Sequence, residues 1–290
     1  MIIERSIVYV LPMRRKILPK SLLLLFYAFA INTVNAQVIL SENFEGSFPP
    51  TNWTLLNVGT GNNWVRDINN PQSGVYSMAC FRGGSNAWAI TPALNITTGF
   101  VYRISYWYKV NYASFHKFKI TIGNAATVAS QNTIIHTYNS VGNVDYIEGV
   151  DYYEPQTSGS RYVAFNCYSE SQYYGNALEI DSIVITRIPI CTGMPSVGVS
   201  IVAGSTICGG DSSLLKLNGN YNQYGLSYQW QSAPLNSNNF TNIQNATDTV
   251  IKVSPLLSTD YRCVVTCTNS GQQLNTNSVA VNINTGCYCT

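Results

Sequence analysis

The sequence predicts an all-β protein made of two β-sandwiches, and three observations support this prediction. Short runs rich in Val, Ile, Tyr and Thr recur through residues 37–290, separated by Gly, Asn and Pro, while helix formers are sparse. A cysteine, a tryptophan and a Tyr-x-Cys segment follow one another at Cys208, Trp230 and 261–263. The chain has 290 residues, which is enough for two domains that each bury a core.

Residues 1–36 are predicted to be an export signal. A basic segment at 13–16 precedes an apolar run at 21–31, and residues 34–36 suit a signal peptidase site. A membrane anchor is the alternative, but the apolar run is about half of the ~20 residues that a spanning helix needs. We therefore expect cleavage before Gln37, a secreted or cell-surface protein, and no membrane span after cleavage.

Composition and motifs argue against two function classes. Charged residues make up 10% of the chain, the net charge is +2, and no Lys/Arg cluster follows residue 20, so we expect no nucleic-acid partner. No Gly-x-Ser-x-Gly, His-Glu-x-x-His or phosphate-loop motif is present. His116 and His136 stand in separate β-like segments without a nucleophile beside them, so we expect no enzyme activity.

The first region, residues 37–190, has the strand pattern of a β-sandwich or jelly roll. Clear strand signals cover 101–110, 117–122, 161–167 and 177–185, with turn residues between them. The second of these strands stops at a Gly-Asn pair, which is typical of a turn.

Four segments of this region occur in the order of a known family. They are Glu42–Trp53 with its Phe-Pro-Pro, Trp88–Leu94, Tyr102–Tyr108 and Leu178–Val184. Together they resemble the bacterial choice-of-anchor J, or cleaved-adhesin, domain. The closing strand departs from the family pattern at Ser182, where an Asp is usual. The resemblance implies a jelly-roll β-sandwich of the kind found on secreted adhesins and on accessory regions of secreted peptidases.

Three acidic residues of the first region form a candidate calcium site. Glu42 and Glu45 flank the first strand, Asp181 lies in the last, and jelly rolls often bring these strands together. Carboxylates with backbone carbonyls are suitable calcium ligands, and related jelly rolls often carry a structural calcium there. The alternative is that Asp181 lies on a solvated face and Glu45 caps a turn.

Aromatic residues form the candidate ligand site. Trp64 in a Gly-rich stretch is the tryptophan expected to be exposed, and tyrosine-rich segments suit binding because each ring offers a large contact area. The candidates are Trp64, Tyr152, Tyr153, Tyr173 and Tyr174. We expect a glycan or an extracellular protein as the partner. Tryptophans in a core and tyrosines as loop residues are the alternative.

The second region, residues 191–284, has the order of an immunoglobulin-type sandwich, with Trp230 between Cys208 and Cys263. Its segments Tyr228–Gln231 and Tyr261–Gly271 resemble the immunoglobulin-like repeats of bacterial surface proteins. That resemblance implies an immunoglobulin-like β-sandwich in the C-terminal half of the chain.

Six cysteines are predicted to form disulfides. Cys263 and Cys267 point to the same face of a regular strand, so Cys208 can pair with only one of them. The core position favours Cys208–Cys263, which leaves Cys267 for Cys191, although connectivity does not follow from sequence alone. In the first region, Cys80 and Cys167 are expected to pair, with two buried thiols as the alternative.

Residues 285–290 are expected to be either the start of a further domain or a tail. The predicted function is that of a secreted, non-catalytic, adhesin-like protein that binds through its jelly roll. The alternative is a structural spacer, or an accessory region of a larger secreted protein or hydrolase.

Overall fold

The structure is a computed structural model that describes residues 36–81, 85–112, 115–169, 176–195, 199–203 (backbone only), 205–218 and 222–287. Within these ranges every regular element is a β-strand, apart from one 3₁₀ turn at Val128–Ser130. The predicted signal peptide lies outside the described residues, except for residue 36. The described residues contain no helix of the length and hydropathy that crossing a bilayer requires.

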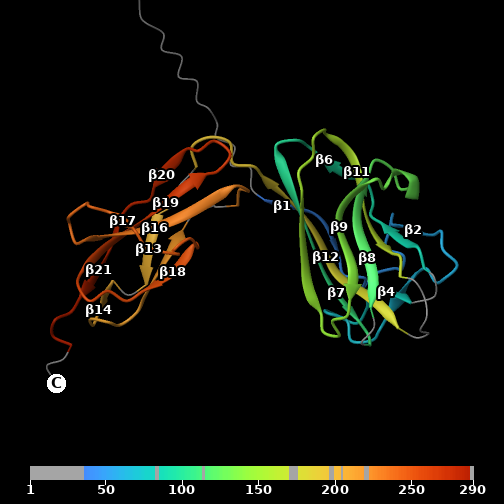
Figure 1. The fold of residues 1–290 in the computed structure, drawn as a ribbon, viewed down its shortest axis with the longest axis horizontal. Helices are drawn as coiled ribbons and strands as arrows, with labels where there is room; N and C mark the ends of the chain where they lie inside the picture. Colours follow the sequence, from blue (N-terminus) through green and yellow to red (C-terminus); the bar gives the residue numbers. More distant parts are fainter. Residues whose placement is uncertain are drawn as a thin grey trace, which may run out of the picture. The chain divides into compact units, whose positions relative to one another are not determined.

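The first sandwich is a jelly roll of two six-stranded antiparallel sheets (Figure 1). One sheet has the order β10 (Ile147–Tyr153), β7 (Phe100–Val110), β12 (Ala177–Pro189), β4 (Ser77–Phe81) and β3 (Trp64–Asp67), with β1 (Gln37–Glu42) beside β12. The other has the order β2 (Thr54–Asn57), β5 (Ala87–Ile90), β11 (Gly159–Cys167), β8 (His116–Gly123) and β9 (Thr133–Val141), with β6 (Leu94–Ile96) beside β11. The four strands predicted at 101–110, 117–122, 161–167 and 177–185 are present, as β7, β8, β11 and β12.

The core of the first sandwich lies between the two sheets and is rich in aromatic side chains. Tyr102, Tyr106, Phe118 and Phe165 are almost fully buried there, because alternate residues of their strands face inward. The first strand, β1, pairs with the last, β12, as the sequence predicted.

The expected bridge between Cys80 and Cys167 is wrong in this structure. Both residues are fully buried free thiols, on β4 of one sheet and β11 of the other. The Cys80 thiol donates to the Asn62 carbonyl at 4.0 Å, and the Cys167 sulfur lies 3.7 Å from the Ser169 hydroxyl. Trp64 is paired with Cys80 in the register of β3 and β4, and Phe118 is paired with Cys167 in the register of β8 and β11.

The second sandwich packs a three-stranded sheet on a six-stranded one. The smaller sheet has the order β13 (Val199–Ala203), β15 (Ser213–Asn218) and β18 (Val250–Val253). The larger has the order β14 (Thr206–Ile207), β21 (Val279–Ile283), β19 (Thr259–Cys267), β16 (Leu226–Pro234) and β17 (Thr241–Asn242), with β20 (Gln273–Asn275) beside β19. Trp230 is fully buried between the sheets, and its indole N–H donates to the Asp248 carbonyl at 2.8 Å.

The expected Cys208–Cys263 disulfide is also wrong. Cys208 lies in the turn between β14 and β15, and it forms a disulfide with Cys287. Leu215, on β15, is fully buried in the same cluster as Trp230 and Cys263, where an immunoglobulin-type pattern would place the first cysteine. Cys263 is therefore left as a buried thiol, and burial raises its pKa to about 11.

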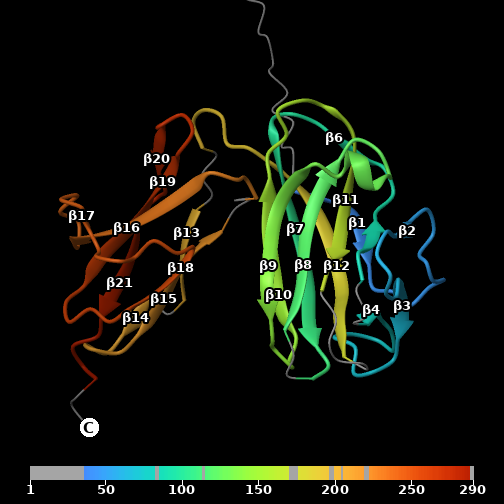
Figure 2. The ribbon, with the colours of Figure 1, turned by 45° about the vertical axis from the view of Figure 1, so that its right-hand side comes forward.

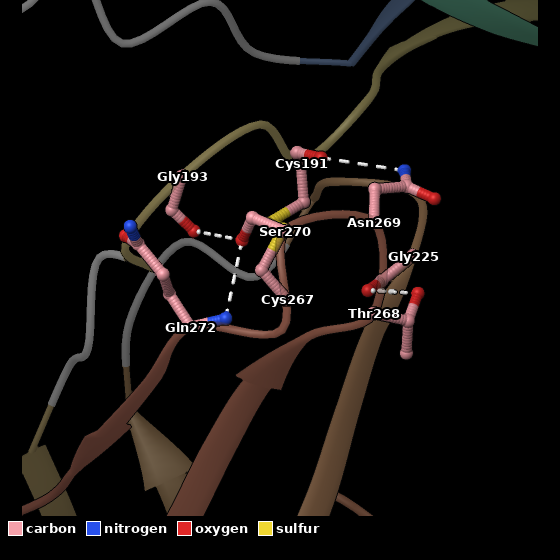
Figure 3. Close-up of a disulfide and its surroundings, with 8 residues drawn as sticks. All are labelled: Cys191, Gly193, Gly225, Cys267, Thr268, Asn269, Ser270 and Gln272. Atoms are coloured by element: carbon pink, nitrogen blue, oxygen red, sulfur yellow. Dashed lines mark hydrogen bonds between the residues drawn. A yellow bond between two sulfur atoms is a disulfide. The ribbon is translucent and has the colours of Figure 1, made fainter.

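The expected Cys191–Cys267 disulfide is present (Figure 3). Around it, side chains of the turn after β19 hold the segment that starts the second region. The Asn269 amide donates to the Cys191 carbonyl at 3.3 Å, and the Ser270 hydroxyl donates to the Gly193 carbonyl at 2.8 Å. The segment that enters this sandwich is thus fixed by one covalent bond and by hydrogen bonds beside it.

Candidate functional site

A polar pocket opens at one end of the first sandwich, where four strands begin or end. Its volume is about 200 Å³. The strands β8 and β10 end there, β9 begins there, and Arg161 lies near the start of β11. Figure 2 shows β7, β8, β9 and β10 beside one another, with β7 and β10 in one sheet and β8 and β9 in the other. The lining residues are Ile122, Gly123, Asn124, Asn132, Thr133, Tyr153 and Arg161.

One wall of the pocket is the turn that joins β8 to β9, and internal hydrogen bonds hold it in shape. The Gln131 amide donates to the Ala125 carbonyl at 3.2 Å and accepts from the Thr121 hydroxyl at 3.0 Å. A Cβ added to Gly123 would lie 2.2 Å from the Ser130 carbonyl oxygen, so only glycine allows the turn to close onto the strand. The wall is therefore in place before any ligand arrives.

Tyr153 brings an aromatic ring to the pocket. It is the last residue of β10, pairs with Tyr102 of β7, and packs partly against the core. Its neighbour Tyr152 is 49% exposed and points to the opposite face of the strand, because successive side chains alternate. Of the two predicted tyrosines that the structure describes, only Tyr153 lines the pocket.

Arg161 brings the only charge among the residues that line this pocket. Its guanidinium donates to the Thr157 hydroxyl at 2.8 Å, the Thr157 carbonyl at 3.4 Å and the Ser160 carbonyl at 3.0 Å. These bonds come from the loop just before β11, so the loop fixes the orientation of the guanidinium.

The pocket combines the groups that sugars need. Asn124, Asn132 and Thr133 are exposed and offer amide and hydroxyl groups, while Tyr153 offers an aromatic surface. Sequence reasoning predicted Tyr153 and recognised the turn at Gly123 and Asn124, but it did not select the asparagines or Arg161. Their individual segments carry no signal for a site, because the pocket arises only where four strand ends meet.

The prediction that Trp64 is exposed is wrong. Trp64 is 2% exposed, and its indole N–H donates to the Ala87 carbonyl at 3.1 Å. It pairs with Cys80 in the register of β3 and β4, which places its ring inward, although Gly and Asn precede it in the sequence. Tyr173 and Tyr174 lie outside the described residues.

The structure brings Glu45 and Asp181 to one loop, residues 72–76, but not Glu42. Glu45 accepts from the amides of residues 75 and 76 at 2.8 and 2.7 Å. Asp181 accepts from the amides of residues 72 and 73 at 2.9 and 3.1 Å. Glu42 instead accepts from the Phe44 amide at 2.6 Å.

These contacts fit calcium poorly. A calcium ion needs oxygen ligands that face it, whereas Glu45 Oε1 and Asp181 Oδ2 each already accept two amide N–H groups. In the part of the chain that the structure describes, no three His, Cys, Asp or Glu side chains are grouped closely enough to hold a metal ion. Calcium at Glu42, Glu45 and Asp181 therefore stays a prediction.

Comparison with known proteins gives one family model and several solved structures. The model described as "Domain of unknown function (DUF8696)" matches residues 197–285, which is less than half of the chain. No curated protein matches at a significant level.

Three similar solved structures each align with about half of this chain. The K3 cleaved adhesin domain of Lys-gingipain from Porphyromonas gingivalis W83 is 14% identical, with a TM-score of 0.40, over 52% of this chain and 99% of that one. The K1 domain of the same protein is 18% identical, with a TM-score of 0.41, over 50% and 96%. The CBM22-1 xylan-binding domain of Paenibacillus barcinonensis Xyn10C is 13% identical, with a TM-score of 0.40, over 54% and 98%.

Proposed function

We propose that this chain is an exported, non-catalytic binding protein whose first sandwich binds a glycan in the pocket around Tyr153. The observation that carries the proposal is the pocket itself. A partly buried aromatic ring lies beside amide, hydroxyl and guanidinium groups, on a wall that hydrogen bonds hold in place. Apolar faces of sugars pack on aromatic rings, and sugar hydroxyls bond to such polar groups.

A glycan fits the pocket better than a protein does. The pocket is about 200 Å³, smaller than the ~300–1,000 Å³ of pockets for drug-sized ligands, so it suits a single sugar unit, and its lining is mainly polar. A protein interface of ordinary size buries roughly 800 Å² per partner around a central apolar or aromatic cluster, which these lining residues do not provide.

The test is binding of the whole chain to an array of neutral and acidic oligosaccharides, with two variants. We expect Y153A to lose binding by about tenfold or more, because the pocket loses its aromatic surface. Y152A is the matched control, since this neighbouring tyrosine faces the opposite side of β10, and it should bind like wild type. A whole chain that binds no oligosaccharide, or equal loss in both variants, would refute the proposal.

For the second sandwich we propose the role of a spacer. Cys191 lies before its first strand and Cys287 after its last, and both are in disulfides. The segments that enter and leave the domain are thus both covalently tied to it. Deletion of residues 194–287 should leave oligosaccharide affinity unchanged if this role is correct, and a loss of affinity would contradict it.

A further inference from the structure

Arg161 differs from the other arginines that the structure describes. Each of the others has a carboxylate or an aromatic ring against its guanidinium. The pairs are Arg103 with Glu148 at 2.9 Å, and Arg66, Arg187 and Arg262 with the rings of Tyr76, Phe100 and Phe240 at 4.3, 4.6 and 4.2 Å. Among the described residues, Arg161 has neither kind of partner, and its positive charge is not balanced by a neighbour.

The guanidinium is held in place but keeps donors for a ligand. Its three bonds to Thr157 and Ser160 use three of the five N–H groups that a guanidinium has, which leaves two. All three of its partners are neutral oxygens. The loop therefore orients Arg161 without neutralising it, which lowers the entropy cost of binding an anion.

The other pocket walls suit an anion as well. None of the seven lining residues is acidic, so no carboxylate repels a negative ligand or competes for Arg161 at the pocket surface. The nearest acidic residue in sequence is Glu154, directly after Tyr153, and its exposed side chain is not part of the lining. Asn124 and Asn132 add amide donors on the facing wall.

We propose that the pocket takes an acidic glycan, namely one in which a sugar unit carries a carboxylate, as a uronic acid does. This rests on the proposed function, which assigns the pocket to sugars. Arg161 binds the carboxylate through charge-assisted hydrogen bonds, for which a guanidinium is the best-suited side chain. Tyr153 packs on the ring of the same or the adjacent sugar, and the asparagines bond to its hydroxyls.

The experiment compares paired ligands on the whole chain. Each pair consists of an oligomer of galacturonate, glucuronate or mannuronate and the methyl ester of the same oligomer. The ester keeps the sugar but removes the negative charge. Neutral xylan and glucan oligomers are tested beside these pairs. We expect the wild-type chain to bind at least one free acid about tenfold or more tightly than its ester, with a preference that weakens as salt is added. R161Q should abolish this difference, because the affinity for the free acid should fall by about 10- to 100-fold.

Two matched controls separate the charge of Arg161 from a change in the loop beside it and from the loss of an arginine elsewhere in the chain. T157V removes one bond to Arg161 but keeps the charge and the carbonyl bonds, so the acid preference should persist. R262Q removes the same charge from the second sandwich and should also leave the preference intact. Equal affinity for acid and ester, binding of neutral oligomers only, or a preference that survives R161Q would overturn this inference while the pocket remains a sugar site. No binding to any oligosaccharide would overturn the proposed function itself.

Discussion

Glu45 and Asp181 lie far apart in the sequence, yet their carboxylates bind successive amides of the same loop, residues 72–76. Asp181 is fully buried and also accepts from the Ser182 amide at 2.6 Å. The two carboxylates thus act as anchors that hold the loop beside Asp181 of the last strand and Glu45, which follows the first strand. Removing an acceptor of this kind leaves partly buried amides without a charged partner, which lowers the free energy of unfolding.

We expect D181A to lower the free energy of unfolding of the first sandwich by about 2–3 kcal/mol, because three amides lose a charged acceptor. E42Q is the control, since Glu42 does not contact the loop and glutamine keeps an oxygen acceptor. Urea unfolding of both variants measures the difference. If D181A loses no more unfolding free energy than E42Q does, Asp181 does not anchor the loop.

The calcium prediction is tested on the same loop. A melting temperature of the wild type that rises with calcium and falls with chelator, with no such response in E45Q and D181N, would establish a cation held by these carboxylates. A melting temperature that calcium leaves unchanged would limit Glu45 and Asp181 to binding the amides of the loop.

G74A should destabilise this loop by a different route. Gly74 has a positive φ of 65°, and an added Cβ would lie 2.5 Å from the Glu45 carboxylate oxygen. Alanine is strained in that conformation and would displace Glu45 from the amides that it accepts. We therefore expect G74A to lower the free energy of unfolding by about 1–3 kcal/mol. Gly46 meets no atom within 4 Å of its added Cβ, so G46A is the matched control. Equal melting temperatures of the two variants would contradict the prediction.

The buried ion pair of Glu179 and Lys109 predicts a pH dependence. The two side chains are 3.2 Å apart, Glu179 is fully buried, and one of its oxygens has no hydrogen-bond partner in the described structure. Burial raises the pKa of Glu179, and the Lys109 charge only partly opposes this. The folded state therefore takes up a proton more readily than the unfolded state does.

The sign of the effect follows from that difference. Folded Glu179 has a raised pKa, whereas unfolded Glu179 has the ordinary pKa of a glutamate, about 4.3. As pH falls from the folded pKa to the unfolded pKa, protonation of Glu179 stabilises the folded state. This stabilisation is lost as pH rises again. In E179Q the glutamine side chain does not titrate, so this variant lacks the effect. The unfolding free energy of wild type minus that of E179Q should therefore increase from pH 7 toward pH 4, measured by urea titration at each pH. A difference that is flat, or that grows as pH rises, would contradict the assignment.

A hydrogen-bonded group in the first core gives a further prediction. The Tyr106 hydroxyl donates to Asp151 at 2.7 Å and accepts from the Tyr138 hydroxyl at 2.9 Å, while the His136 Nδ1–H donates to the same carboxylate at 2.7 Å. Y106F removes one of the two donors to Asp151 and the acceptor of the Tyr138 hydroxyl, so we expect the free energy of unfolding to fall by about 1–2 kcal/mol. Tyr112 is 64% exposed, and Y112F should leave the unfolding midpoint unchanged.

The strands could be predicted from the sequence far better than the site. Alternation in segments such as 117–122 reports directly which side chains face a core, so β8 was found to within one residue at each end. Trp64 shows the limit of such reasoning, because strand register, and not its Gly- and Asn-rich neighbours, decides that its ring faces inward. Register depends on pairing between distant segments, which a local pattern does not contain.

The pocket and the disulfides depend on the same kind of distant pairing. Arg161 and Asn124 meet only because β8 and β11 are paired in the sheet. The Cys-Trp-Tyr-x-Cys order correctly indicated a second β-sandwich, with Trp230 and Tyr261 in its core. The first cysteine nevertheless lies outside β15, so the usual pairing of that order does not hold here.

Mass spectrometry of labelled cysteines tests these pairings. Cys80, Cys167 and Cys263 are fully buried thiols, so an alkylating reagent should label them only in denaturant. Proteolysis without reduction should release peptides joined through Cys191–Cys267 and Cys208–Cys287. A peptide that joins Cys208 to Cys263 would restore the pairing expected from the sequence. It would also require Cys208 to move from its turn into the core position that Leu215 fills, with a matching change in the packing around Trp230.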